Sequence, residues 1–174
     1  MPDIKYEIIK KIGIVSSFKG GTCEFNIVKW NNGQNKYDLR KWNNNYPNKG
    51  ITFAISELGN LYNILKHIEM NEPNITTPKY TYKNGDAKAE IYDVLGIVSS
   101  NSEKSMVTQI TYTSWTGKPK YDFRPWNHDY SACGKGISLD KNEINVLRLL
   151  IEKELLNINK EEDYDTSAID DLLI

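Results

Sequence analysis

One long segment of the chain is written twice in the sequence. GIVSS occupies residues 13–17 and 96–100, KYDLRKW at residues 36–42 is matched by KYDFRPW at 120–126, and KGIT at 49–52 is matched by KGIS at 135–138. By subtraction of residue numbers the paired motifs stand 83, 84 and 86 positions apart, so their order is kept and the loops differ by only a few residues. A colinear repeat of this length indicates a duplicated structural unit.

The repeat sets the domain organisation. Within the 174 residues we assign 4–68 to a first unit, 69–87 to a linker, 88–158 to a second unit and 159–174 to an acidic, disordered tail. A unit of about 65 to 70 residues buries too little surface for a secure core of its own. We therefore expect the two units to share one core.

Both units show the same order of predicted elements. In the first, alternating apolar residues and turn signals predict strands at 12–17, 22–30, 36–42 and 50–53, followed by a helix from Ser56. In the second, strands are predicted at 95–100, 106–115, 120–126 and 136–139, and Asp140 with Glu143 predicts the capping box of a second helix. The predicted fold is α+β: two tandem β-β-β-β-α repeats with antiparallel sheets, packed through their helices as an intrachain pseudo-dimer. The composition of linker residues 76–82 fits either a strand or a coil.

Composition argues against several function classes. No run approaches the eighteen or more apolar residues of a membrane span, and residues 1–11 lack the apolar core of a signal peptide. Cys23 and Cys133 fall at non-equivalent places in the repeat, which favours free thiols in a reducing cytoplasm. His67 and His128 stand apart from other ligand-type residues, so no metal is expected. Without a phosphate-binding glycine loop or a catalytic constellation, the sequence predicts neither a cofactor nor an enzyme.

The net charge of −1 is distributed unevenly along the chain. From residue 157 onward the charges sum to −5, which leaves +4 on residues 1–156. A mildly basic body therefore ends in an acidic tail. The abundance of Lys, Asn, Ile and Tyr is typical of AT-rich genomes, so we expect a bacterial or phage protein, located in the cytoplasm of the bacterium or infected host.

The twice-written strip indicates a candidate binding surface. Side chains alternate across a strand, so Tyr37 and Leu39 are predicted to face the core, as are Tyr121 and Phe123. The opposite face then carries Lys36, Asp38, Arg40 and Trp42 in one unit and Lys120, Asp122, Arg124 and Trp126 in the other. Cationic side chains neutralise phosphates and aromatic rings stack on bases, which together bind single strands without reading their sequence. The alternative is a solvated sheet surface in which Trp packs and Asp38 pairs with Arg40.

Other residues extend this candidate surface. Trp30 and Trp115 end the second strands and serve either as stacking platforms or as packing residues. Lys49 and Lys135 precede the fourth strands, where a lysine can hold a phosphate or simply keep an edge soluble. Phe18 and Lys19 lie in the first turn of the first unit, and Lys104 lies in the matching turn of the second.

The order of these motifs resembles the positive-cofactor-four family of transcriptional coactivators and its bacterial and phage relatives. The first unit matches through Phe18-Lys19-Gly20, Asp38-Leu39-Arg40, Trp42 and Lys49-Gly50-Ile51-Thr52; the second matches through Asp122-Phe123-Arg124, Trp126 and Lys135-Gly136-Ile137-Ser138-Leu139 but replaces the first turn by Asn101-Ser102-Glu103-Lys104. The resemblance implies a dimer whose helices pack across the two-fold axis and whose curved sheets bind single-stranded DNA. With both halves in one chain, it implies a monomer that acts as a pseudo-dimer.

The C-terminal tail has a second predicted role. It ends in Asp170, Asp171, Leu172, Leu173 and Ile174, and acids followed by apolar residues resemble the tails with which bacterial single-stranded-DNA-binding proteins recruit replication and repair proteins. A disordered solubilising tail is the alternative. The leading function is sequence-tolerant binding of single-stranded DNA in replication, recombination or transcription. The alternatives are a protein-interaction adaptor or transcription cofactor, and an RNA-binding protein.

Overall fold

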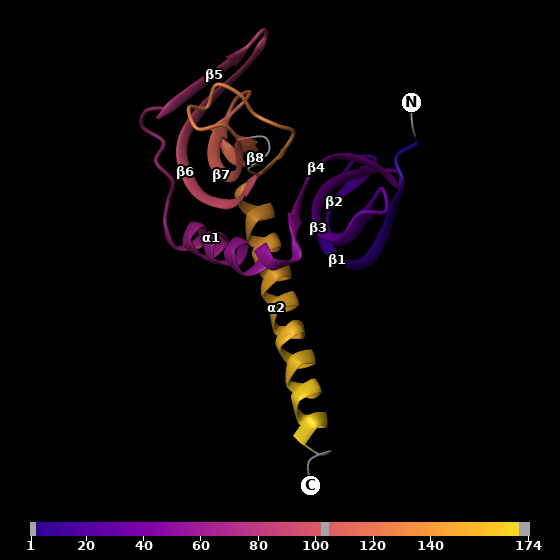
Figure 1. Cartoon of the computed structure of the whole chain (residues 1–174). Coiled ribbons are helices and arrows are strands. Elements are labelled where there is room, and N and C mark those ends of the chain that lie inside the picture. The colour runs from indigo at the N-terminus through magenta and orange to yellow at the C-terminus, as the bar shows by residue number, and fades with distance from the viewer. Residues whose placement is uncertain (1–2, 102–104, 171–174) are drawn as a thin grey trace.

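The computed structural model describes residues 3–101 and 105–170. Within these residues it contains two sheets and two α-helices, whose arrangement is drawn in Figure 1. The first sheet is formed by β1 (Tyr6–Phe18), β2 (Gly21–Trp30), β3 (Asn35–Asn43) and β4 (Tyr46–Ala54), followed by the 3-10 turn η1 (Ile55–Glu57) and helix α1 (Leu58–Met70). The second sheet is formed by β5 (Tyr80–Asn84), β6 (Ala87–Asn101), β7 (Met106–Ser114), β8 (Lys120–Trp126) and β9 (Ile137–Leu139), followed by helix α2 (Lys141–Asp170).

Both sheets are antiparallel with neighbouring strands in chain order. The predicted α+β class is confirmed, and each predicted strand overlaps a strand of the structure. The second sheet has five strands instead of four, because β5 from the linker pairs with the start of β6. This answers the question that the linker sequence left open.

The sheets are strongly rolled. Trp42 pairs with Thr22, which lies eight residues from Trp30 along β2. On a flat sheet that separation corresponds to roughly 26 Å, yet the ring centroids of Trp30 and Trp42 lie 6.5 Å apart. The face that carries them, away from the helices, is therefore concave. The register shifts along β1 and β6 mark the bulges that allow such bending.

One apolar core joins the opposite faces of both sheets to both helices. Tyr37, Leu39, Tyr121 and Phe123 lie in this core, so the predicted inward face is confirmed. The rings of Phe53 and Phe123, one from each sheet, lie 6.4 Å apart within it.

Each helix contacts a long strand of the other unit: α1 contacts β6, and α2 contacts β1. On β6, the backbone oxygens of Ile97 and Val98 accept hydrogen bonds from the Asn60 amide of α1, at 2.9 and 3.0 Å. On β1, the Ser16 hydroxyl donates to Glu143 of α2 at 2.6 Å. The core therefore cannot be divided between the two sheets without breaking helix contacts.

The helix ends follow local signals in part. The capping box is confirmed, since the Glu143 amide donates to Asp140 at 2.9 Å and the Asp140 amide donates to Glu143 at 3.1 Å. The tail predicted as disordered from residue 159 is instead helical as far as Asp170, because α2 continues beyond the core (Figure 1). Among the helices of the described residues, none is both long and apolar enough to cross a membrane.

Candidate nucleic-acid interface

A tryptophan, an aspartate and an arginine form a compact group on the concave face of the first sheet. The Trp30 indole N–H donates to Asp38 Oδ2 at 3.1 Å, and Arg40 pairs with the same carboxylate at 2.9 Å. The Arg40 guanidinium carbon lies 4.6 Å from the centre of the Trp30 ring, which is a cation–π contact. Alternation along β3 places Asp38 and Arg40 on one face, and the last residue of β2 supplies the ring.

The second sheet carries the same group. Trp115 N–H donates to Asp122 Oδ2 at 3.1 Å, Arg124 Nε lies 2.7 Å from Asp122, and the guanidinium carbon lies 4.2 Å from the centre of the Trp115 ring. Here a further donor is present, because the Ser138 hydroxyl also donates to Asp122 at 2.7 Å.

Burial sets the electrostatics of these groups. Asp38 and Asp122 are fully buried, and the two arginine side chains are each 16% exposed. Burial raises the pKa of Asp38, while the hydrogen bonds from Arg40 and Trp30 oppose that rise. Burial alone lowers the pKa of Arg124, but its hydrogen bond and charge interaction with Asp122 outweigh burial and raise it. Each arginine is thus compensated by its aspartate, so the net positive charge of the surface comes from neighbouring lysines.

Those lysines line a cleft where the two sheets meet. The cleft has a volume of about 560 Å³. It is lined by Ile4, Trp30, Arg40, Pro47, Asn48, Lys49 and Gly50 from the first unit and by Arg124, Lys135 and Gly136 from the second. Lys49 and Lys135 are exposed. Each unit therefore contributes an arginine, a lysine and a glycine to the cleft, and these three residues occupy matching positions in the repeat.

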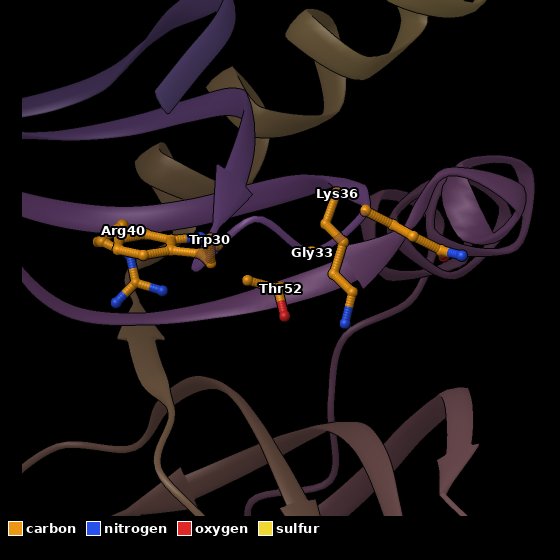
Figure 2. Close-up of a pocket in the computed structure, with 6 residues that line it drawn as sticks. Trp30, Gly33, Lys36, Arg40 and Thr52 are labelled. Atoms are coloured by element: carbon orange, nitrogen blue, oxygen red, sulfur yellow. The ribbon is translucent and has the colours of Figure 1, made fainter. Parts of the chain in front are cut away.

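A second pocket adjoins this cleft in the first unit. It has a volume of about 390 Å³ and shares Trp30 and Arg40 with the cleft. Its other lining residues are Gly33, Gln34, Lys36 and Thr52. In Figure 2, Lys36 lies opposite Trp30 and Arg40, with Thr52 between them. Both hollows are lined by Trp30 and Arg40, and we call the two together the binding path.

The structure corrects the exposure predicted for the outward face. Trp42 is 4% exposed and Trp126 is fully buried, and neither indole N–H has a hydrogen-bond partner among the described residues. Trp42 lies against Trp30, and Trp126 against Trp115. They lie on the predicted face, but rolling of the sheet closes that face over them. Neither ring can act as an open stacking platform in this conformation.

The remaining predicted residues are dispersed. Phe18 is exposed at the first turn and has the Lys41 ammonium 6.0 Å from its ring centre, but it lines a different hollow beside the start of α2. Lys19 and Lys120 are exposed and do not line the cleft or the adjoining pocket. Lys104 and residues 171–174 of the predicted tail motif lie outside the described residues, and Asp170 is the last residue of α2.

Sequence reasoning missed the two glycines that build the cleft. A Cβ on Gly50 would lie 2.6 Å from the Leu39 oxygen, and one on Gly136 would meet the Phe123 oxygen in the same way. Only glycine lets the backbone pass so close to the neighbouring strand. The doubled Lys-Gly-Ile motif was the signal for these positions. Gln34 and Thr52 carried no comparable signal, because their role depends on how the sheet rolls.

Comparison with known proteins gives one informative result. No family model matches the chain. A protein of Treponema pallidum (strain Nichols) described as "Uncharacterized protein" is 36% identical over 75 residues, which cover 87% of that protein and 42% of this chain. The matched stretch is therefore about as long as one of the two repeated units. With this identity and coverage, the chain belongs to the same family as the uncharacterized protein of Treponema pallidum.

Proposed function

We propose that the protein binds single-stranded DNA without strong sequence preference, in the cleft between its two sheets. The observation that carries this proposal is the convergence of Arg40, Lys49, Arg124 and Lys135 on one cleft next to the partly exposed Trp30. Lysines there neutralise phosphates, and the Trp30–Arg40 group offers a flat surface for bases. This is the combination that single-strand-binding proteins use.

Within this proposal the two units act as a pseudo-dimer in one chain. Three observations support it: the colinear motifs, the contact of each helix with the other unit's long strand, and a relative about one unit long. The resemblance to the positive-cofactor-four family agrees with this arrangement. The role we propose is non-catalytic and belongs to replication, recombination or transcription in a bacterial or phage-infected cytoplasm, with the acidic C-terminus recruiting replication or repair proteins.

The burial of two tryptophans weakens the adaptor alternative. That alternative relied on exposed tryptophan surfaces and on the tail, whereas Trp42 and Trp126 are buried. RNA stays an alternative ligand, because stacking and phosphate contacts do not inspect the sugar. We therefore keep RNA as an arm of the test.

The test is fluorescence anisotropy of labelled oligo-thymidine, oligo-uridine and duplex DNA across a salt series. The net charge of the binding path comes from three lysines, Lys36, Lys49 and Lys135, so the slope of log affinity against log salt should be about −2, at roughly 0.7 per phosphate contact. Preference for oligo-thymidine over duplex is expected. Equal affinity for both forms, or no salt dependence, contradicts the proposal, and tighter binding of oligo-uridine identifies RNA as the ligand.

A charge-matched pair of variants locates the site. Lys49→Ala/Lys135→Ala removes the two exposed lysines of the cleft and should weaken binding of oligo-thymidine at least tenfold at low salt. Lys83→Ala/Lys88→Ala removes two exposed lysines of the β5–β6 hairpin, outside the cleft, and should change affinity less than threefold. Equal effects of the two pairs would mean that general charge, and not the cleft, governs binding.

A further inference from the structure

We infer that base stacking is confined to the first unit. Trp30 and Trp115 are both half-buried, but Trp30 lines the pocket of about 390 Å³, whereas Tyr82 of the β5–β6 hairpin lies edge-on against both Trp115 and Trp126. This inference rests on the proposed function. It assigns different roles to the two units: the first binds bases, and the second contributes phosphate contacts through Lys135.

A layer of three tyrosines forms a cap over the concave face of the second sheet. Tyr82 of β5 places its ring edge-on to Trp115 at 5.6 Å and to Trp126 at 5.4 Å. Tyr130 contacts Trp126 at 5.6 Å, stacks on Tyr80 at 4.2 Å and donates its hydroxyl hydrogen to Gln109 at 2.7 Å. Tyr82, Tyr130 and Trp126 form a small core on the concave side together with Ala89 and Ile91.

The first unit has a thinner cover at the corresponding place. Tyr6 contacts both Trp30 and Trp42 at 5.4 Å, but it remains 38% exposed, whereas Tyr82 is 8% exposed. The first sheet has four strands, with β1 at its edge, so no strand corresponding to β5 lies over this site among the described residues. The pocket of about 390 Å³ opens beside Trp30.

The polar side chains near Trp30 are also more available for hydrogen bonding than those near Trp115. Gln34 and Thr52 line the first unit's pocket, and the structure shows no side-chain hydrogen bond to either from the residues it describes. Ser138, the counterpart of Thr52, already donates to Asp122. A base edge entering the first pocket therefore meets unused donors and acceptors, and Lys36 at the same pocket can hold the adjoining phosphate. The volume is within the range of small-ligand sites.

The experiment compares Trp30→Leu with Trp115→Leu on oligo-thymidine and on an abasic oligonucleotide of equal length. One stacked base is worth about 1 to 3 kcal/mol, so Trp30→Leu should weaken binding of oligo-thymidine roughly 5- to 150-fold. On the abasic strand the same variant should stay within twofold of wild type. Trp115→Leu should stay within threefold on both strands. A purely structural effect of Trp30→Leu would reduce binding of both strands and would overturn the inference.

Photo-crosslinking of the unmodified protein to oligo-thymidine carrying 5-iodouracil gives a readout that needs no core substitution. The crosslink is expected on the peptide containing Trp30, and Tyr82→Ala should add a crosslink at Trp115 by opening the cap. Equal crosslinking at both tryptophans in wild type overturns the inference while leaving the proposed function intact. Absence of oligo-thymidine binding by wild type overturns both.

Discussion

At the scale of single residues, two buried carboxylates organise the candidate site. Asp38 accepts hydrogen bonds from both Trp30 and Arg40, and Asp122 does the same for Trp115 and Arg124. Each aspartate therefore fixes a ring and a guanidinium with respect to one another before any ligand arrives. This preorganisation lowers the cost of ordering the site on binding.

Replacing Asp38 should destabilise the fold as well as the site. In Asp38→Asn, the Arg40 guanidinium keeps its charge at 16% exposure without a compensating carboxylate. Breaking a buried pair in this way costs about 3 kcal/mol, which should appear as a lower urea midpoint for unfolding. Asp86→Asn, at an exposed turn position, is the control and should leave the midpoint unchanged. An Asp38→Asn midpoint equal to wild type would show that the pair contributes nothing.

The buried thiol of Cys23 predicts a loss of stability at alkaline pH. Burial raises its pKa from 9.0 to about 12, and burial also raises the pKa of Tyr37 from 10.0 to about 12. Above pH 9 the unfolded chain releases the Cys23 proton while the folded chain retains it. The free energy of unfolding should therefore fall as pH rises from 9 to 12, by about 1.4 kcal/mol per pH unit for one such group.

The contribution of Cys23 can be separated from that of Tyr37. Urea unfolding at closely spaced pH values should show the decline beginning near pH 9 in wild type and near pH 10 in Cys23→Ala, where the phenols of Tyr37 and other partly buried tyrosines remain. If the two proteins decline in parallel from pH 9, the thiol is not the group responsible.

At the scale of elements, two glycines allow the helices to lie close to the long strands. A Cβ on Gly13 of β1 would lie 2.5 Å from Leu150 of α2, and a Cβ on Gly96 of β6 would lie 2.6 Å from Ile64 of α1. Both glycines open the repeated GIVSS motif. The repeated glycine thus marks, in both copies, a contact between a strand of one unit and the helix of the other.

Substituting these glycines should cost stability through overpacking. Gly13→Ala and Gly96→Ala are each expected to lower the free energy of unfolding by about 1 to 2 kcal/mol, since the leucine or isoleucine must shift. Gly59→Ala is the matched control: nothing lies within 4 Å of its added Cβ in α1, so the variant should gain up to about 1 kcal/mol from helix propensity. Chemical denaturation of the three variants measures the signs, and the same sign at Gly13 and Gly59 would contradict the packing argument.

The strands and helices also show which parts of the fold could be predicted from the sequence. Alternation, turn residues and the Asp140–Glu143 pair are local signals, and they predicted the strand order, the inward face and the start of α2. Rolling of the sheets is a cooperative result of bulges and core packing, so alternation put Trp42 on the correct face without revealing that it is buried. The composition of residues 76–82 fitted a strand and a coil equally; in the structure β5 pairs with β6, and its Tyr82 packs in the small core of the second unit.

At the scale of the whole molecule, α2 ties the two sheets into one cooperative structure. Its Leu147 and Ile151 lie fully buried in the core that both sheets share. Arg148 of α2 pairs with Glu69 of α1 at 3.2 Å, and Lys10 of β1 pairs with Glu154 of α2 at 3.0 Å. A change on the buried face of α2 therefore acts on both units at once.

A pair of leucines on α2 tests this cooperativity. Leu147→Ala removes a fully buried side chain and should lower the free energy of unfolding by about 2 to 5 kcal/mol. Leu149→Ala, whose side chain is 55% exposed, should change it by less than about 0.5 kcal/mol. Tryptophan fluorescence follows both concave faces, and far-ultraviolet circular dichroism follows the helices. The two probes should give one coincident urea transition in Leu147→Ala, as in wild type. Two separated transitions would mean that each sheet keeps a core of its own, and would contradict the shared core as the reason why units of this size remain folded.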